Sequence, residues 1–581
     1  MTYNVQNNDG RYITEINILN GELIPLKRIL HENSIIKWVL NYIDKYMKRP
    51  LSEDDMIYYF IKAENIKNMM NIEKNRITRY LIKVFGKDVV YRWEFNSNSH
   101  VFTIITNTAI TLPEHILARP KKLTIDPYQE SIAELYRDEW DTSQYTEDKK
   151  TTFIRTCTIQ LTEACNLCCS YCYQINKKQN KMDFETAKKF VDIILESNEN
   201  TPYLHSDVLY GLVFDFVGGE SFVEVDLMDK ICEYIIDRIL QLRHRWLFTT
   251  RLGTSSNGTL HMTEKVQKFL DKWEVMFSTA ITVDGCKELH DMCRLFPDGS
   301  GSYELAIAAV KDLENRGQGM ASKVTLSPDN LGYFYKAITN MVELGYTDIH
   351  SNPIFEEGWT IEDAKKYFIE LKKIATYFLD NDLYHKVDFI VWKEDGIGKI
   401  PDDDNANWCG GDGSMIAVNP SGNIYPCLRY METSIGDNVE PYIVGDVDNG
   451  LLYTEKQKIM ADELTKITRK SQSTKECIDC PVNQGCSWCT AYNYQRFGTP
   501  NKRATFICWM HKAEVLANAY YWNNVRMKYP SIKFPFLIHL PKDDALNIIT
   551  EDEWTSLKDL EQRAIEVVET HQNIKITRSE I

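Results

Sequence analysis

The stretch Cys165-Asn-Leu-Cys-Cys169-Ser-Tyr171-Cys172 decides how the rest of the chain is interpreted. Its cysteines have the spacing C-x3-C-x2-C, and an aromatic residue stands directly before the last one. Three thiolates on one tight loop suit a four-iron cluster in which one iron has no protein ligand, whereas a closed structural metal site requires four ligands. The preceding run 156–162 (TCTIQLT) predicts a strand, so the loop lies at a strand's carboxyl end. A zinc loop or a chance group of cysteines is the alternative.

Three further motifs follow, each after a run of β-type residues. Residues 212–217 (LVFDFV) lead into Gly218–Ser221 (GGES), where two glycines allow close approach of the backbone to a ligand and a glutamate can accept from an ammonium group. Residues 252–259 contain Ser255–Gly258 (SSNG), a turn after a third strand. Residues 281–285 (ITVDG) precede His290, Asp291, Arg294, Gly299, Gly301 and Ser302.

In this order the motifs resemble the signature of the radical SAM superfamily, whose open iron chelates S-adenosylmethionine. The resemblance implies that Cys165, Cys169 and Cys172 bind a [4Fe-4S] cluster. Arginine suits a fork-like contact with a carboxylate. The implied contacts with S-adenosylmethionine are Tyr171 at the adenine, Gly218, Gly219 and Glu220 at the amino group, Ser256 and Asn257 in the turn, Thr282 and Arg294 at the methionyl carboxylate, and Ser327 with Asn330 near the ribose. The family has Pro where this chain has Ser221, which is a mild departure.

The predicted fold class is α/β, a partial (β/α)6 barrel over residues 156–376 with its site at the carboxyl ends of the strands. Two further strands are predicted at 321–327 and 348–354. The helical patterns between the strands cover residues 184–196, 226–242, 263–272, 303–316 and 331–344.

A second group of seven cysteines lies in the last third of the chain. The spacing is Cys409-x12-Gly422-x4-Cys427, then Cys477-x2-Cys480-x5-Cys486-x2-Cys489, and finally Cys508. A zinc ribbon requires about 15–20 residues between its two cysteine pairs, and only five residues separate Cys480 from Cys486.

The pattern instead resembles the SPASM domain, an auxiliary two-cluster module attached to radical SAM barrels, although x2 before Cys489 replaces the family's x3. The resemblance implies two further [4Fe-4S] clusters, one held by Cys409, Cys427 and Cys489 and the other by Cys477, Cys480, Cys486 and Cys508. The first of these has only three cysteines, so it would have an open iron or a non-cysteine ligand. The remaining five cysteines are interpreted as structural: Cys157, Cys168, Cys232, Cys286 and Cys293.

Composition limits the class of protein. The 581 residues carry a net charge of −16, which argues against a nucleic-acid substrate. No stretch reaches the roughly 18 apolar residues of a membrane span, and no secretory signal is expected. Because thiolate-bound clusters need reduced cysteines, we expect a cytoplasmic protein under low oxygen.

The N-terminal segment differs in charge, since residues 1–119 carry 16 Lys and Arg against 13 Asp and Glu. Predicted helices at 33–48, 52–63 and 72–85, followed by a hairpin of 89–95 with 100–106, form a winged-helix pattern. Beside a radical SAM–SPASM enzyme this segment resembles a RiPP recognition element, which binds the leader of a precursor peptide, for example by strand addition. A scaffold role and DNA binding are the alternatives.

The predicted domains are therefore 1–119 (winged-helix-like), 120–150 (linker), 151–376 (barrel), 377–521 (SPASM) and 522–581 (helical extension). The branch resembled makes Cys-to-carbon thioether links in a precursor peptide with a leader and a Cys-containing core. Reductive cleavage of S-adenosylmethionine would give a 5′-deoxyadenosyl radical, with flavodoxin or ferredoxin as electron donor. Formylglycine formation, another radical cross-link or epimerisation, and a non-catalytic iron–sulfur regulator are the alternatives. The sequence identifies no catalytic acid or base.

Overall fold

The structure is a computed structural model. It describes residues 153–572 except for gaps at 199, 205–208, 243–249, 275, 319–320, 356–357, 385, 394–396, 408, 437–438 and 531–534. It also describes six strands within the first 152 residues. The chain forms two compact units, one of residues 1–152 with 236–250, the other of residues 153–235 with 251–581.

The first unit contains an antiparallel sheet in the order β1-β2-β5-β4. Its strands are β1 (Tyr3–Gln6), β2 (Tyr12–Asn17), β5 (Val101–Thr106) and β4 (Val90–Asn96). The pairing of β4 with β5 confirms the predicted hairpin. A separate parallel pair joins β3 (Glu22–Pro25) to β6 (Pro120–Thr124). The three predicted helices lie outside the described residues, so the winged-helix interpretation stays a prediction.

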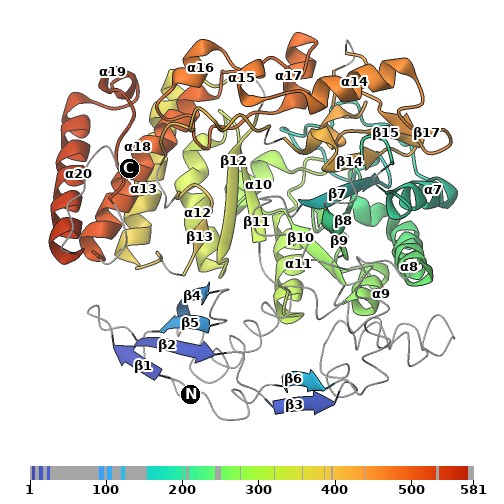
Figure 1. Ribbon diagram of the computed structural model, residues 1–581, viewed down its shortest axis with the longest axis horizontal. Helices are drawn as coiled ribbons and strands as arrows, with labels where there is room; N and C mark the ends of the chain where they lie inside the picture. Colours follow the sequence, from blue (N-terminus) through green and yellow to red (C-terminus); the bar gives the residue numbers. More distant parts are fainter. Residues whose placement is uncertain are drawn as a thin grey trace. The chain divides into compact units, whose positions relative to one another are not determined.

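The second unit is built on parallel strands, which confirms the α/β prediction. They are β7 (Phe153–Gln160), β8 (Leu209–Val217), β9 (Thr250–Ser256) and β10 (Phe277–Ile281) in one sheet, and β11 (Ala321–Leu326), β12 (Asp348–Pro353) and β13 (Asp388–Phe389) in a second. β10 contacts β11, but the two belong to separate hydrogen-bonded sheets. Figure 1 shows the strands side by side with the helices around them.

Helices follow the strands as the sequence predicts. They are α7 (Phe184–Leu195), α8 (Val225–Gln241), α9 (Glu264–Trp273), α11 (Tyr303–Asn315), α12 (Phe334–Glu343) and α13 (Ile361–Asp380). Their starts are encoded locally: Asp183 caps α7, and Thr360 forms a capping box with Asp363 at α13. Each helix buries its apolar face, as α9 does with Val266, Phe269, Leu270 and Trp273.

The cysteine-rich region continues the same sheet. Strand β14 (Met415–Val418) pairs in parallel with β7, and β15 (Asn423–Tyr425), β16 (Gly445–Asp446) and β17 (Gly450–Leu451) extend the sheet as antiparallel strands. The buried Arg155 of β7 donates from Nε to the carbonyl oxygen of Gly413 at 3.1 Å. This pairing fixes the cysteine-rich region against the first strand of the barrel.

The C-terminal helices cover the other side. Helix α18 (Cys508–Lys528) packs against α13, and α20 (Glu551–Gln572) packs on α18 (Figure 1). One apolar core runs from β10 through α13 to α18 and includes Phe334, Phe378 and Tyr521. Among the described residues, no helix is long and apolar enough to cross a membrane.

Candidate functional site

The loop after β7 holds its three motif thiols in a defined backbone frame. The amide of Cys168 donates to the carbonyl of Leu295 at 2.8 Å, and that of Ser170 donates to the carbonyl of Cys293 at 2.9 Å. These bonds tie the loop to the end of α10 (Lys287–Cys293). Cys168 itself is exposed, whereas the three motif cysteines are half-buried.

Each motif thiol accepts one N–H donor. The backbone N–H of Leu167 donates to Cys165 Sγ at 3.4 Å, Nη1 of Arg294 to Cys169 Sγ at 3.9 Å, and Nζ of Lys177 to Cys172 Sγ at 3.5 Å. Donors of this kind suit thiolates that bind a metal cluster.

The three thiols also act on one another electrostatically. Burial raises the pKa of Cys169 to about 11, with Arg294 opposing the shift and the thiols of Cys172 and Cys165 adding to it. Burial also raises the pKa of Cys165. A metal overrides such shifts because it stabilises the thiolate directly. In the described part of the chain, no three His, Cys, Asp or Glu side chains converge on a position for a single metal ion.

The glycine pair after β8 packs on the cysteine loop. The N–H of Gly219 donates to the Thr162 carbonyl at 3.0 Å, and the N–H of Glu220 donates to the Ala164 carbonyl at 2.9 Å. A Cβ at Gly219 would lie 2.3 Å from the carbonyl oxygen of Ala164, so no side chain fits there. Gly219 thus allows the close approach of two protein segments, a role that the sequence pattern alone does not distinguish from ligand approach.

Glu220 joins the second motif to the third. Its carboxylate, 2% exposed, accepts from Ser256 Oγ at 2.8 Å, the Asn257 N–H at 2.8 Å and the Phe222 N–H at 3.1 Å. Burial raises the pKa of Glu220, and these donors oppose the rise. Because Oε2 accepts only from Asn257 among the described residues, it has room for one more donor.

The turn after β9 also contacts the cysteine loop. Asn257 Nδ2 donates to Asn166 Oδ1 at 2.9 Å, and Asn166 Nδ2 donates to Thr259 Oγ1 at 2.7 Å. Gly258 has φ +79°, a left-handed conformation that favours glycine. The first three motifs therefore meet at one edge of the sheet, as the predicted strand ends require.

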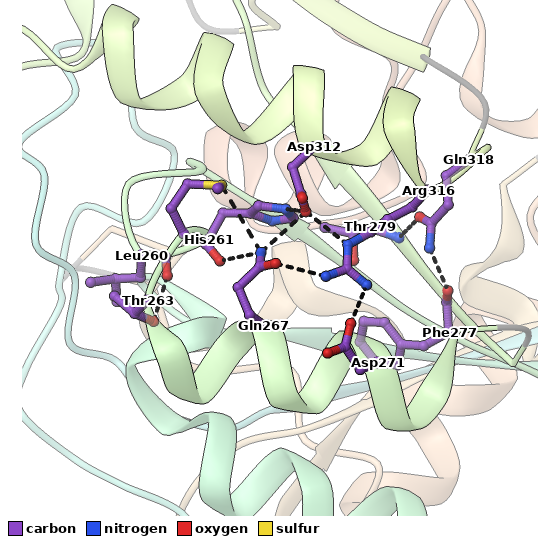
Figure 2. Close-up of polar contacts among 11 residues, drawn as sticks. Leu260, His261, Thr263, Gln267, Asp271, Phe277, Thr279, Asp312, Arg316 and Gln318 are labelled. Carbon is purple, nitrogen blue, oxygen red and sulfur yellow. Dashed lines mark hydrogen bonds and ion pairs between the residues drawn. The ribbon is translucent and has the colours of Figure 1, made fainter.

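A polar network behind this turn holds it in place (Figure 2). His261 Nε2 contacts Asp312 of α11 at 2.8 Å, and Gln267 of α9 donates to the same carboxylate at 3.1 Å. Arg316 donates from Nε to Asp312 at 2.8 Å and from Nη1 to Asp271 at 2.7 Å. The sequence analysis missed this support, because its members are polar residues on helix faces without motif spacing.

Asp284 organises the fourth motif. It is fully buried and accepts from Arg294 Nε at 2.6 Å, from the Thr325 N–H at 3.0 Å and from the hydroxyl of Tyr171. The Arg294 guanidinium also lies over the Tyr171 ring, 5.2 Å from its centroid. Tyr171 and Arg294, expected at opposite ends of S-adenosylmethionine, thus contact each other through Asp284. The sequence analysis included Asp284 in a motif but gave it no role.

His290 and Ser302 support Arg294 from behind. The Asp284 N–H donates to His290 Nδ1 at 3.3 Å, His290 Nε2 contacts Ser302 Oγ at 3.0 Å, and Ser302 Oγ donates to the Arg294 carbonyl at 2.8 Å. This order of donors requires a neutral imidazole with its hydrogen on Nε2. Burial is the main reason that the pKa of His290 is lowered to about 4.

Thr282, Ser327 and Asn330 lie at the ends of neighbouring strands. The Thr282 N–H donates to the Ser256 carbonyl at 3.0 Å. The Asn330 side chain accepts from the Ser327 N–H at 2.8 Å and donates to the Thr325 carbonyl at 3.1 Å. Asn330 is therefore already engaged in closing its own loop, and its ribose contact, like that of Ser327, stays a prediction.

The seven C-terminal cysteines fall into two groups in space. Burial raises the pKa of Cys427, with further rises from Cys489 and Cys409. Burial also raises the pKa of Cys486 to about 11, and the neighbouring thiols are those of Cys508, Cys477 and Cys480. Cys489 thus lies with Cys409 and Cys427, although only two residues separate it from Cys486 in the sequence.

The two groups have different polar neighbours. Thr490 Oγ1 lies 3.1 Å from Cys409 Sγ, and the Tyr492 N–H donates to Cys489 Sγ at 3.5 Å. Arg503 and Lys512 act on the second group through Cys486 and Cys508 respectively. The cysteines interpreted as structural are buried, except for Cys168.

No protein-family model matches the chain. An uncharacterised protein of Methanocaldococcus jannaschii is 24% identical over 269 residues, covering 46% of this chain and 83% of that protein. The antilisterial bacteriocin subtilosin biosynthesis protein AlbA of Bacillus subtilis is 23% identical over 287 residues, 48% of this chain and 56% of that protein.

Two solved structures share the arrangement of elements. Native anSMEcpe with bound AdoMet and Cp18Cys peptide has 18% identity and a TM-score of 0.46, and the match covers 64% of this chain and 99% of that one. Streptococcus suis SuiB bound to precursor peptide SuiA has 11% identity and a TM-score of 0.41, covering 78% of this chain and 92% of that one. The resemblance to radical SAM enzymes with a SPASM domain, drawn from the motifs, is confirmed.

Proposed function

We propose that the protein is a radical SAM enzyme that installs Cys-to-carbon thioether cross-links in a ribosomally made precursor peptide. The observation that carries the proposal is the meeting of separate motifs at one sheet edge. The cysteine loop is hydrogen-bonded to Glu220 through Ala164 and to Asn257 through Asn166. A chance group of cysteines would have no reason to be held by a glycine-glutamate turn and an asparagine turn together.

The residues present fit a [4Fe-4S] cluster with an open iron. Cys165, Cys169 and Cys172 are free thiols on one loop, and each accepts an N–H donor. When bound, such a cluster supplies the electron that cleaves S-adenosylmethionine to methionine and a 5′-deoxyadenosyl radical.

The surrounding side chains fit the methionyl end of S-adenosylmethionine. Glu220 Oε2 has room for one ammonium donor. Arg294 uses Nε on Asp284, which leaves its two terminal nitrogens directed away from that pair for a carboxylate. Asp284 keeps the guanidinium in place, so this arginine is pre-oriented rather than free to search.

Two auxiliary [4Fe-4S] clusters complete the proposal. Cys477, Cys480, Cys486 and Cys508 would hold one with four thiolates. Cys409, Cys427 and Cys489 would hold the other and leave one iron for a substrate thiol or for a non-cysteine ligand. The Thr490 hydroxyl, 3.1 Å from Cys409 Sγ, is the nearest side-chain oxygen that the structure gives for the latter role.

The remaining parts of the proposal concern partners. The first 119 residues would bind the leader of the precursor peptide, while the Cys-containing core enters the barrel. A flavodoxin or ferredoxin would supply electrons in the cytoplasm. The relatives support a peptide substrate, since AlbA is a bacteriocin biosynthesis protein and SuiB is bound to a precursor peptide.

Anaerobic reconstitution tests the proposal. The purified chain should bind about twelve irons, four for each of three clusters, and convert S-adenosylmethionine to 5′-deoxyadenosine under a chemical reductant. A zinc-rich, iron-poor protein, or one that loads iron but forms no 5′-deoxyadenosine, would overturn it.

A further inference from the structure

The two side-chain donors at the cysteine loop are both cations. Lys177 Nζ lies 3.5 Å from Cys172 Sγ, and Arg294 Nη1 lies 3.9 Å from Cys169 Sγ. Only Cys165 receives its donor from an uncharged backbone group, the N–H of Leu167. Positive charge is thus concentrated on two of the three positions around one loop.

The two cations differ in how their charge is balanced. Arg294 forms an ion pair of 2.6 Å with Asp284, which is fully buried. Lys177 is half-buried, and the groups that act on it are the thiols of Cys172, Cys165 and Cys169. Within the described part of the chain, Lys177 has no ion pair with a carboxylate. Its charge therefore faces the thiols without a counter-charge, whereas the charge of Arg294 is largely cancelled.

We propose that Lys177 and Arg294 set the reduction potential of the cluster held by Cys165, Cys169 and Cys172, with Lys177 as the stronger determinant. The inference rests on the proposed function, since it requires that cluster. Reduction adds one negative charge to the cluster, and a nearby cation stabilises the added charge. Hydrogen bonds to cluster sulfurs act in the same direction. Asp284 opposes Arg294 because its carboxylate lies beside the guanidinium.

The proposal gives opposite signs for two substitutions. Lys177→Met removes an unbalanced positive charge, so the cluster should become harder to reduce. Asp284→Asn removes a negative charge and uncovers that of Arg294, so the cluster should become easier to reduce. A loss of packing in either variant would not produce shifts of opposite sign.

The test is a redox titration of the reconstituted full chain, followed by electron paramagnetic resonance, in a Cys409→Ala and Cys477→Ala background that removes the auxiliary signals. K177M should lower the electron affinity at least tenfold, which is 59 mV for a one-electron couple. K177R should stay near the wild-type potential, and K177Q should repeat K177M. Lys178→Met is the matched control, because Lys178 is the exposed neighbour and has no contact with a thiol among the described residues.

The outcomes separate the two claims. A wild-type chain that assembles no cluster overturns the proposed function and this inference together. A chain that assembles the cluster and forms 5′-deoxyadenosine, but has equal potentials in K177M, K177Q and K178M, overturns the inference alone. If D284N does not assemble a cluster, Arg294→Gln replaces it, with an expected shift in the same direction as K177M and of smaller size. A shift in the opposite direction contradicts the proposal.

Discussion

The two three-cysteine groups have the same ligands and opposite surroundings. Around Cys165, Cys169 and Cys172 the side-chain donors are Lys177 and Arg294. The group of Cys409, Cys427 and Cys489 lies among buried tyrosines, where Tyr203 and Tyr430 act electrostatically on Cys427. A charged site suits the repeated binding of a small zwitterion, whereas an apolar, phenolic site suits a cluster that stays shielded from solvent.

The largest effect should separate the two groups by function. Cys165→Ala should lose about four of the roughly twelve irons and all formation of 5′-deoxyadenosine. Cys409→Ala should also lose about four irons but keep 5′-deoxyadenosine formation, because it leaves the barrel site intact. Iron analysis and a single-turnover assay measure both. Equal loss of activity in the two variants would remove the distinction.

The next effect concerns Glu220, which has no counterpart in the second group. Glu220→Gln should weaken S-adenosylmethionine binding about tenfold to a hundredfold, because a charge-assisted hydrogen bond to an ammonium contributes about 1.5–3 kcal/mol. Equilibrium binding to the reconstituted protein measures it. Glu224→Gln is the control, since Glu224 pairs with Lys181 on the outside of the same turn. An unchanged affinity in E220Q would exclude the ammonium contact.

A smaller effect tests whether the glycine pair packs on the cysteine loop. Gly219→Ala places a Cβ 2.3 Å from the Ala164 carbonyl, and overpacking of this kind costs about 1–3 kcal/mol. Chemical denaturation should show that loss of stability, together with reduced iron loading. Gly332→Ala should be neutral, because nothing lies within 4 Å of its added Cβ. Equal stability of the two variants would contradict the packing.

The smallest effect is a dependence of stability on pH at His290. Its pKa is lowered to about 4 in the folded chain, mainly by burial, against about 6.5 in the unfolded chain. The unfolded state therefore binds more protons between these values, and stability present above pH 6.5 is lost as the pH falls toward 4. We expect a loss of about 2 kcal/mol in urea unfolding. His290→Gln should flatten the profile, whereas substitution of the half-exposed His350 should leave it unchanged.

The sequence predicted the alternating strands and helices because hydrophobic runs and caps are local signals. It predicted which residues meet at the sheet edge because the carboxyl ends of parallel strands share one edge. It did not predict that β14 joins β7, since a four-residue strand with a partner more than 250 residues away has no local signature. It also gave no role to Asp284 or Lys177, whose importance depends on neighbours that only the folded chain brings together.

The central claim is that Cys165, Cys169 and Cys172 bind the cluster that meets S-adenosylmethionine, and that the other cysteines do not. Electron paramagnetic resonance of the reduced, reconstituted chain, recorded before and after addition of S-adenosylmethionine, tests it most directly. We predict a changed signal in the wild-type chain and in Cys409→Ala, and no change in Cys165→Ala. An unchanged wild-type signal, or a change that persists in Cys165→Ala, would contradict the claim.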